Sequence, residues 1–273
     1  GRLPNRLKLK ALKQDLIENC VLPPKLYDLL HLYAPWGNAM AKLRTCVSFL
    51  THFDDEITDH SFAADHRKAV RIMSKVATIV AAIDRIRNNR PPIDPSSIKA
   101  SSVAEMFLWM LTGKRPAPTA VKALDKCLVL HAEHELNAST FAARVTVSTM
   151  SDTYSGIVSA IGTLKGPLHG NANEQVARML EEIGDIAKVE SYIEQKIQNK
   201  EVIMGFGHRV YKNGDPRAKY LQKIARELAE WRGDLRWYNM LVAIEKTVAE
   251  KKGLLPNVDF YSAAIYTYLE IPR

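Results

Sequence analysis

The chain has 273 residues, of which 47% are apolar and 25% are charged, and its formal net charge is +8. This composition is ordinary for a globular protein, and the length suffices for one large domain or two smaller ones. No apolar run approaches the roughly 18 residues that span a bilayer, and no basic-then-apolar secretory leader opens the chain. Three widely separated cysteines argue against a disulfide framework or a CxxC metal site and favour a reducing compartment; they are Cys20, Cys46 and Cys127.

The net charge of +8 leaves three interpretations open. The first is a lysine-rich surface without a specific partner. Nucleic acid is a weaker second, because the basic residues are spread along the chain rather than gathered in one arm. The third is a site for small polyanions, whose local concentration a positive field raises. The motifs below favour the third, so we expect no nucleic-acid partner and no membrane partner.

Apolar residues recur at helical spacing along most of the chain. Met73, Val76, Val80 and Ile83 follow one another at i, i+3, i+7 and i+10, which predicts a long helix over residues 65–88. Similar stripes predict helices over 7–17, 24–32, 40–50, 103–111, 121–130, 176–183, 219–231 and 241–248. Few segments alternate with period two, so the expected fold class is all-α.

Prolines mark helix starts and connectors between these helices. Pro23-Pro24 and Asp215-Pro216 are typical of the first helical turn, where a proline loses no hydrogen bond. Residues 90–95 and 113–118 are predicted to be connectors. We place the domain boundary just after Gly170, with a first domain at 1–169, a second at 170–268, and a return towards the first at 269–273. Because the chain opens without methionine and stops at residues 271–273, we expect both ends to be cut.

The first of four polar motifs is His131-Ala-Glu-His-Glu-Leu-Asn-Ala-Ser139. His131 and His134 lack the HExxH spacing of a zinc helix, so we expect no metal. His134 is predicted to lie on one helix with His131, so one of the two could be a hydrogen-bonded core histidine. Asn137 and Ser139 follow closely, however, and gather hydrogen-bonding groups at one point.

The second motif is Gly166-Pro-Leu-His-Gly170. Its His169 lies in a turn between glycine and proline, where a backbone can approach a ligand closely. Asn171, with Glu174 three residues on, is typical of a helix N-cap. His169 would then stand at a helix N-terminus, which favours a neutral imidazole that donates a hydrogen bond. The alternative is a turn histidine exposed to water.

The third motif runs from Gly205-Phe-Gly-His208 to Asp215-Pro-Arg217. It is not a dinucleotide loop, because no strand precedes it and position 210 is not glycine. If Asp215 caps a helix, Arg217 adds positive charge to an end that is already positive. Together with His208 this favours an anion site. The alternative is an Arg217 side chain bent back onto Asp215.

The fourth motif is Pro256-Asn-Val-Asp-Phe-Tyr-Ser262. Asp259 is an acid within an apolar run, where a carboxylate is costly unless it is hydrogen-bonded or reactive. The alternative is that Asp259 merely caps the final helix, although Asn257 would do so equally well.

In this order the four motifs resemble those of the citrate synthase family. The resemblance implies an all-α fold with a large helical domain and a smaller mobile one that closes over substrate. It implies that His169, His208 and Asp259 are catalytic. It further implies that oxaloacetate is bound by His134, Arg217 and Asn137. For coenzyme A the positions to consider are Arg209, Lys212 and Asn257.

The implied reaction is a Claisen condensation of acetyl-CoA with oxaloacetate, followed by hydrolysis of citryl-CoA to citrate and CoA, as in the tricarboxylic acid cycle. A carboxylate of ordinary pKa near 3.9 does not deprotonate a thioester methyl group alone. Asp259 would therefore take the proton while His169 donates to the thioester oxygen. His208 would donate to the oxaloacetate carbonyl, and Arg217 would grip a carboxylate by its fork. Acetyl-CoA is expected as co-substrate, with no permanently bound cofactor.

Alternatives and departures accompany this resemblance. Asn171 replaces an expected glycine, and family members begin before Gly1 and continue past Asp259 into a segment with further substrate arginines, one from the partner subunit. We therefore expect the chain as it stands to be inactive. The alternative functions are a 2-methylcitrate synthase that uses propionyl-CoA and a non-catalytic homologue that dimerises or binds CoA. Leu168 and the run at 208–212 favour citrate synthase. We expect a homodimer or hexamer in the cytoplasm, with the mitochondrial matrix as the alternative.

Overall fold

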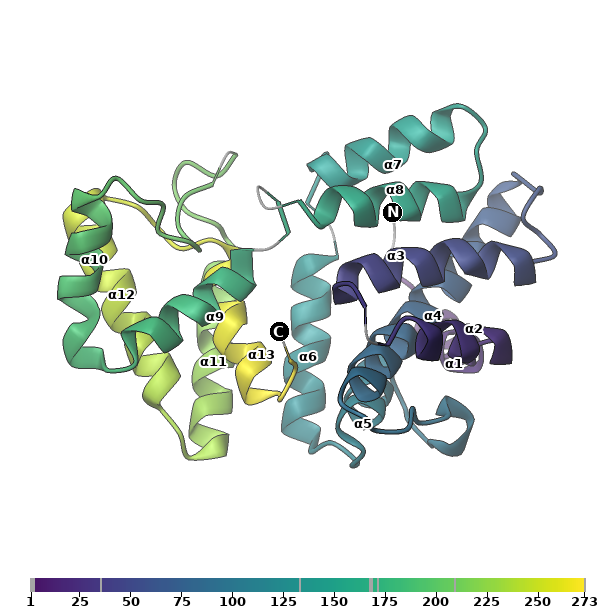
Figure 1. Ribbon diagram of the computed structural model, residues 1–273, viewed down its shortest axis with the longest axis horizontal. Coiled ribbons are helices and arrows are strands. Elements are labelled where there is room, and N and C mark those ends of the chain that lie inside the picture. The colour runs from purple at the N-terminus through teal and green to yellow at the C-terminus, as the bar shows by residue number, and fades with distance from the viewer. Residues whose placement is uncertain are drawn as a thin grey trace. The chain divides into compact units, whose positions relative to one another are not determined.

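The computed structural model describes residues 3–34, 36–132, 134–166, 169–170, 172–208 and 210–272. Within these residues the chain forms α-helices α1 to α13 and three short 3₁₀ helices, and its only strand-like feature is one isolated β-bridge (Figure 1). The all-α prediction is therefore confirmed. The chain divides into two compact units, each described by itself: unit 1 is Gly1–Ala117 with His134–Gly166, and unit 2 is Pro118–Glu133 with Pro167–Arg273.

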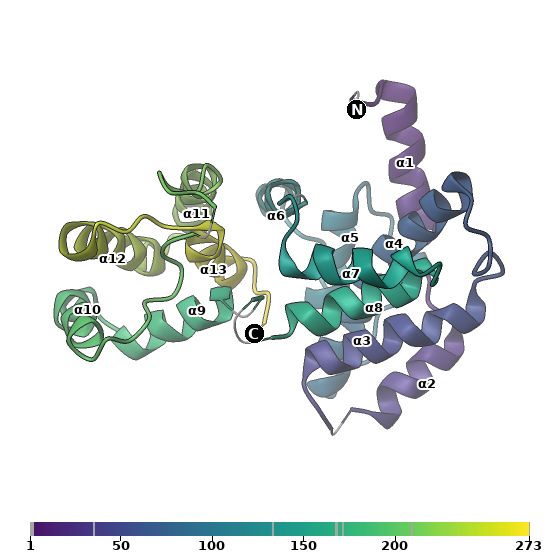
Figure 2. The same ribbon diagram turned by 90° about the horizontal axis from the view of Figure 1, so that it is seen from above.

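In its described residues, unit 1 holds seven α-helices and two 3₁₀ helices. The α-helices are α1 (Arg6–Glu18), α2 (Pro24–Leu32), α3 (Ala39–Phe49), α4 (Phe62–Arg87), α5 (Val103–Thr112), α7 (Ala138–Ser148) and α8 (Thr153–Leu164), and the 3₁₀ helices are η1 (Leu50–Phe53) and η2 (Pro95–Ser97). The core lies between α2, α3, α4 and α8, where Leu26, Val47 and Ile79 are fully buried. Helix α1 buries no residue, and Figure 2 shows its first turns extending away from the rest of the unit.

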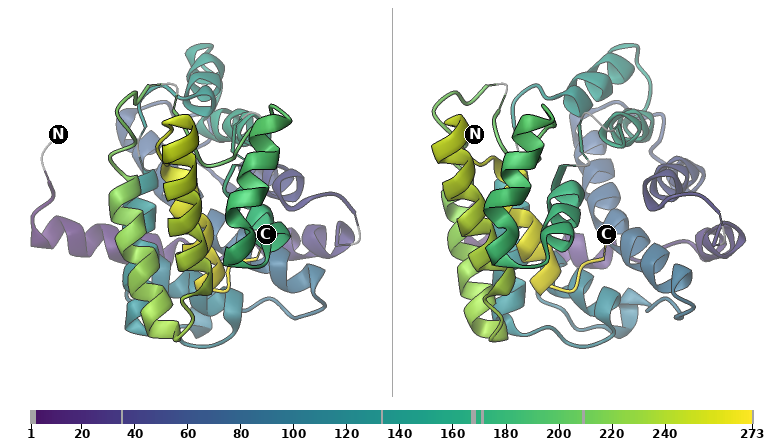
Figure 3. Two further views of the ribbon diagram at one scale, coloured as in Figure 1. Left: turned by 90° about the vertical axis from the view of Figure 1, so that its left-hand side faces the viewer. Right: turned by 60° about the vertical axis from the view of Figure 1, so that its left-hand side comes forward.

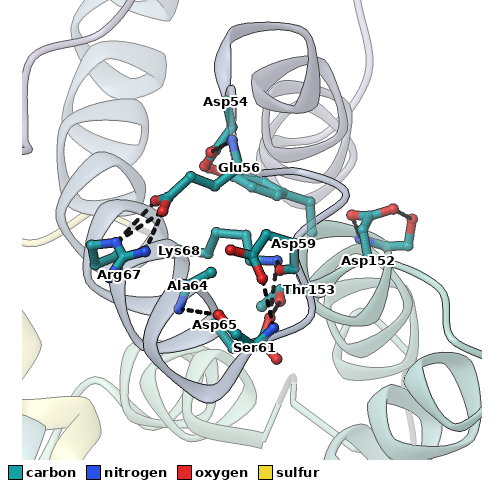
Figure 4. A network of polar contacts seen from close by, with 12 residues as sticks. Asp54, Glu56, Asp59, Ser61, Ala64, Asp65, Arg67, Lys68, Asp152 and Thr153 are labelled. Atoms are coloured by element: carbon teal, nitrogen blue, oxygen red, sulfur yellow. Dashed lines mark hydrogen bonds and ion pairs between the residues drawn. The ribbon is translucent and has the colours of Figure 1, made fainter.

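A polar network joins the start of α4 to the start of α8 (Figure 4). The Lys68 side chain is fully buried, and its Nζ donates to the carbonyl of Asp59 at 2.6 Å and pairs with Asp65 at 2.9 Å. Asp65 also accepts a hydrogen bond from the Thr153 hydroxyl at 2.9 Å. Because every buried charge here has a partner, we interpret the network as structural.

Beside it, Asp54 is a buried carboxylate with a similar set of partners. It accepts two hydrogen bonds from Arg71, at 2.9 and 2.8 Å, and one from the Tyr154 hydroxyl at 2.5 Å. Burial alone would raise the pKa of Asp54, but these hydrogen bonds hold it below its ordinary value. Asp54 thus anchors α4 and α8 to the segment that follows η1.

Unit 2 holds the remaining helices. They are α6 (Pro118–His131), α9 (Ala172–Ile183), η3 (Ile186–Lys188), α10 (Val189–Gln198), α11 (Ala218–Arg232), α12 (Arg236–Lys252) and α13 (Val258–Tyr268). Helix α13 packs against α9, α11 and α12, and Figure 3 shows these helices from two further sides. Its Phe260, Ala264 and Ile265 are fully buried, as are Leu221 and Leu228 of α11. The apolar run around Asp259 is therefore the core-facing side of α13.

Every helix that the sequence predicted is present, within a residue or a few at its ends. The start at Pro24 is confirmed, with proline in the first turn of α2. The start predicted at Asp215-Pro216 is wrong by two residues: α11 begins at Ala218, and Arg217 is its N-cap. The reason is that Asp215 accepts the backbone N–H of Arg217 at 3.0 Å, which closes a turn before the helix.

The compact units differ from the expected domains in two respects. The expectation placed residues 118–133 with the first domain, whereas α6 packs on α11 and groups with unit 2. Residues 269–273 also group with unit 2. The resumption of unit 2 at Pro167 lies close to the expected boundary at Gly170. That the smaller domain moves over substrate stays a prediction.

Gly205 yields a prediction about stability. Its φ is +85°, and a Cβ there would lie 2.8 Å from Phe260 Cδ2 and 2.9 Å from Val176 Cγ2. Gly205→Ala should therefore destabilise the protein by about 1–3 kcal/mol through overpacking, in addition to the strain of a positive φ. Thermal unfolding checks this, with Gly207→Ala as the matched control, because Gly207 has a φ of +75° but no described residue within 4 Å of an added Cβ. Equal losses in the two variants would contradict the packing argument.

Candidate active site

Two of the sequence motifs are joined by a short backbone bridge in unit 2. Phe206 and Pro256 form an antiparallel bridge. The N–H of Gly207 donates to the carbonyl of Leu255 at 2.9 Å, and the N–H of Asn257 donates to the carbonyl of Gly205 at 2.9 Å. The loop that carries His208 and the start of α13, which carries Asp259, are thus held side by side.

Asn257 is the N-cap of α13. Its Oδ1 accepts the N–H of Asp259 at 3.0 Å, and its Nδ2 donates to the carbonyl of Gly207 at 3.0 Å. The alternative that Asp259 caps this helix is therefore wrong, because Asn257 already does so and Asp259 is the second residue of the helix. The Asp259 carboxylate is left available for chemistry.

Asp259 lies partly buried among charged groups. Burial raises the pKa of its carboxyl above the ordinary value, and the negative charge of Asp215 acts in the same direction. The charges of His131, Arg217 and His169 oppose this rise in pKa. No residue that the structure describes donates a hydrogen bond to this carboxylate. A carboxylate of raised pKa without hydrogen bonds is a stronger base than an exposed one.

Arg217 is bent back onto Asp215, as the alternative interpretation anticipated. Its Nε donates to Oδ1 of Asp215 at 2.9 Å, and its Nη2 donates to Oδ2 at 2.7 Å. A guanidinium carries five N–H donors, and this pair uses two of them. No hydrogen bond joins Nη1 to a described residue, so the contact with Asp215 and a role in oxaloacetate binding are compatible.

The loop fixes the tautomer of His208. Its Nδ1 accepts the backbone N–H groups of Val210 and Tyr211, both at 3.0 Å. A ring nitrogen that accepts hydrogen bonds carries no proton, so the proton of the neutral ring is on Nε2, which can donate to a ligand. The rings of His208 and Tyr211 are 4.6 Å apart, and the Arg217 guanidinium carbon lies 5.9 Å from the centre of the Tyr211 ring. The Tyr211 ring is therefore close to both His208 and Arg217.

His169 lies in a turn just before α9, which begins at Ala172. It is partly buried, and its charge is among those that act on Asp259. The predicted capping of α9 by Asn171, and the suggestion based on Leu168, lie outside the described residues. Glu174, the second residue of the predicted capping box, pairs instead with Arg178 at 2.7 Å.

The prediction that His134 shares a helix with His131 is wrong. Helix α6 ends at His131, and α7 begins at Ala138 after a turn in which Glu135 has a φ of 49°. Asn137 caps α7, because its Oδ1 accepts the N–H of Thr140 at 2.9 Å. His134 and Asn137 belong to unit 1, so their place in the same site as His169, His208 and Asp259 stays a prediction.

His131 lies near Asp259, which the sequence did not predict. It closes α6, and its Nδ1–H donates to the carbonyl of Cys127 at 2.8 Å. It is the first among the charges that lower the pKa of Asp259, and its ring lies 6.5 Å from that of Tyr266 in α13. Only the packing of α6 on the rest of unit 2 reveals this proximity, since 128 positions of sequence separate His131 from Asp259.

The three candidate CoA-binding residues differ in their surroundings. Lys212 is exposed and free to meet a phosphate, whereas Arg209 lies outside the described residues. Both polar atoms of the Asn257 side chain are engaged within the protein. We therefore attribute to Asn257 a structural role, and a CoA contact at Lys212 or Arg209 stays a prediction.

Among the described residues, no helix combines the length and the apolar composition needed to span a membrane. In the same residues no group of three or more His, Cys, Asp or Glu side chains is arranged to hold a metal ion. The three cysteines are free and buried.

The chain is similar to known proteins over its whole length. Residues 1–273 match the family model described as citrate synthase, C-terminal domain. Citrate synthase 2 of Bacillus subtilis is 49% identical over 99% of this chain and 72% of that protein, and the citrate/2-methylcitrate synthase of the same organism is 40% identical over 100% and 73%. The ternary complex of carboxymethyl coenzyme A and oxaloacetate with citrate synthase from Thermoplasma acidophilum has a TM-score of 0.90, with 31% identity over 100% of this chain and 72% of that one. The chain therefore belongs to the citrate synthase family.

Proposed function

We propose that this enzyme condenses acetyl-CoA with oxaloacetate and then hydrolyses citryl-CoA to citrate and CoA. The transfer of an acyl group in a condensation follows from the family. The observation that carries the residue assignment is the bridge in unit 2 that holds the His208 loop against the start of the Asp259 helix. We assign catalysis to His169, His208 and Asp259.

Asp259 is the proposed base that removes a proton from the acetyl methyl group. Its burial, its raised pKa and the absence of a hydrogen-bond donor among the described residues all favour transfer of a proton from a carbon acid to this carboxylate. Because the side chain of Asn257 caps α13, the Asp259 carboxylate does not cap this helix. His169 is the proposed donor to the thioester oxygen, where the enolate charge develops.

His208 is the proposed donor to the oxaloacetate carbonyl. The acceptor role of its Nδ1 leaves Nε2–H as the donor, so the loop prepares the tautomer that this task needs. The open edge of Arg217 would hold a carboxylate of oxaloacetate, with His134 and Asn137 as further proposed contacts. The Asn137 contact would have to use Nδ2, since Oδ1 caps α7.

A comparison of acyl donors tests this function. The protein is assayed for CoA release with oxaloacetate and either acetyl-CoA or propionyl-CoA. We expect the higher kcat/KM with acetyl-CoA. A preference for propionyl-CoA would favour the alternative of a 2-methylcitrate synthase. The 40% identity to a citrate/2-methylcitrate synthase is the observation that supports this alternative. Binding of CoA without turnover of either donor would favour a non-catalytic homologue.

We also propose that the enzyme acts as a homodimer or hexamer in the cytoplasm. Membership of the citrate synthase family supports this proposal, together with the oligomeric state and location that we expect from the sequence. Sedimentation velocity of the protein measures the oligomeric state directly, and a monomer at working concentration would contradict the proposed assembly.

Arg217 provides a test of oxaloacetate binding. Arg217→Lys keeps the charge but loses the open guanidinium edge, so the KM for oxaloacetate should rise several-fold. Arg217→Ala should raise it further, because each hydrogen bond to a charged group contributes about 1.5–3 kcal/mol. The KM for acetyl-CoA at saturating oxaloacetate serves as the internal control and should change far less. If the pair with Asp215 is only structural, both variants lower the melting temperature and leave the oxaloacetate KM unchanged.

A further inference from the structure

Asp215 is a buried carboxylate that holds two elements of unit 2 at once. It is 6% exposed and accepts four hydrogen bonds. Three come from the backbone and guanidinium of Arg217, at 2.7 to 3.0 Å. The fourth comes from the backbone N–H of Val258 at 3.0 Å. Val258 is the first residue of α13 and immediately precedes Asp259. One side chain therefore joins the N-cap of α11 to the first turn of α13.

These contacts determine how Arg217 faces a ligand. A guanidinium is planar and rigid, so fixing Nε and Nη2 on a buried carboxylate fixes the direction of the remaining edge. The Tyr211 ring, 5.9 Å from the guanidinium carbon, packs on the same group. Without Asp215, the long arginine side chain would sample several rotamers, and ordering one of them would cost binding free energy.

The same contacts affect Asp259. The hydrogen bond to Val258 N–H holds the backbone next to Asp259, and the charge of Asp215 raises the pKa of the Asp259 carboxyl. The other charges that face Asp259 are those of His131 from α6, of Arg217 at the start of α11 and of His169 before α9. Asp215 is the only carboxylate among these four groups.

We propose that Asp215 is a positioning residue for both halves of the reaction: it presents Arg217 to oxaloacetate and holds the start of the helix that carries Asp259. This inference rests on the proposed function. It assigns to Asp215 no contact with substrate. Its effect passes through Arg217, which governs oxaloacetate affinity, and through Asp259, which governs proton abstraction.

The test compares the wild type with Asp215→Asn. Oxaloacetate binding is measured by titration calorimetry, and kcat is measured as a function of pH with acetyl-CoA. The amide keeps the size of the side chain but loses its charge, so oxaloacetate affinity should fall several-fold. Because a neighbouring negative charge is lost, the pKa of Asp259 should fall, and the acidic limb of the kcat profile should move to lower pH.

A matched control is available in unit 1. Asp54 is also a buried carboxylate, 8% exposed, held bidentately by Arg71. Asp54→Asn should lower thermal stability about as much as Asp215→Asn, yet leave oxaloacetate affinity and the acidic limb in place. A second variant, Asp215→Glu, retains the charge but displaces the carboxylate by one methylene. It should restore the acidic limb while oxaloacetate affinity stays low.

The outcomes separate this inference from the proposed function. If the wild type does not bind oxaloacetate, the proposed function is overturned and the inference with it. If the wild type binds oxaloacetate but Asp215→Asn loses only stability, as Asp54→Asn does, the inference alone is overturned. If Asp215→Asn folds poorly, Asp215→Glu is the variant that tests the inference. The inference is then overturned if Asp215→Glu binds oxaloacetate as tightly as the wild type does.

Discussion

Replacing Asp259 by asparagine should lower kcat on the order of 10²-fold or more and at the same time raise the thermal stability of the protein. The loss of rate is expected because the amide does not accept a proton from the acetyl group. Oxaloacetate affinity should stay nearly intact, since Arg217 and the His208 loop are held by Asp215 and by the bridge at Phe206 rather than by Asp259.

The gain in stability follows from the direction of the pKa shift. In the folded protein the pKa of Asp259 is raised by burial, whereas in the unfolded chain it is near 3.9. As pH rises above 3.9, the unfolded chain releases this proton first, so the folded state loses stability until pH passes the folded pKa. Above the folded pKa the full penalty is present, and asparagine removes it. The stability advantage of the variant should vanish as pH falls below the unfolded pKa.

Calorimetric melts at neutral pH and near pH 4 measure this effect, and each kcal/mol corresponds to roughly 2–4 °C in a chain of this size. Asn257→Ala is the matched control in the same helical turn. It removes the N-cap of α13, so the free energy of unfolding should fall by about 1 kcal/mol and the melting temperature should fall with it. A lower melting temperature for Asp259→Asn, with most of the rate retained, would contradict the proposed base.

The sequence predicted most of the described helices and missed three of them. The missed helices are α7, α8 and α10. Helix α7 buries no residue, so its sequence shows no stripe facing a core. Helix α8 carries Gly156, at which a Cβ would lie 2.7 Å from Val147 Cγ1, so that glycine permits close packing on α7. A glycine selected for close approach resembles a helix breaker when only propensity is considered.

At the site, residue types were predictable but their local partners were not. The acid in an apolar run and the histidine among glycines stand out in any sequence of helical stripes. The correct choice between Asn257 and Asp259 as cap depended on which side chain reaches the N–H of Asp259. The double role of Asp215 depended on the proximity of Val258, which is 43 residues away in sequence. Such contacts are set by tertiary packing, which local patterns do not encode.

Replacing His169 by alanine should abolish enolisation of acetyl-CoA. The measurement is exchange of the acetyl methyl protons with deuterium in the presence of a non-reacting oxaloacetate analogue. His169 lies in the turn before α9, close enough to Asp259 for its charge to act on that carboxyl. The enolate oxygen needs a donor as the proton leaves, and loss of one such donor typically costs about 10²–10³-fold in rate. Exchange should fall by at least that factor, because Asp259 alone is too weak a base for a thioester methyl group.

The control for this experiment is His208→Ala, which separates the two proposed donors. His208 is assigned to the oxaloacetate carbonyl through its Nε2–H, so its loss should stop condensation but leave exchange from acetyl-CoA largely in place. The opposite pattern, with exchange retained in His169→Ala and lost in His208→Ala, would exchange the two roles. Undiminished exchange in both variants would mean that neither histidine stabilises the enolate, and the donor would have to be sought elsewhere in the protein.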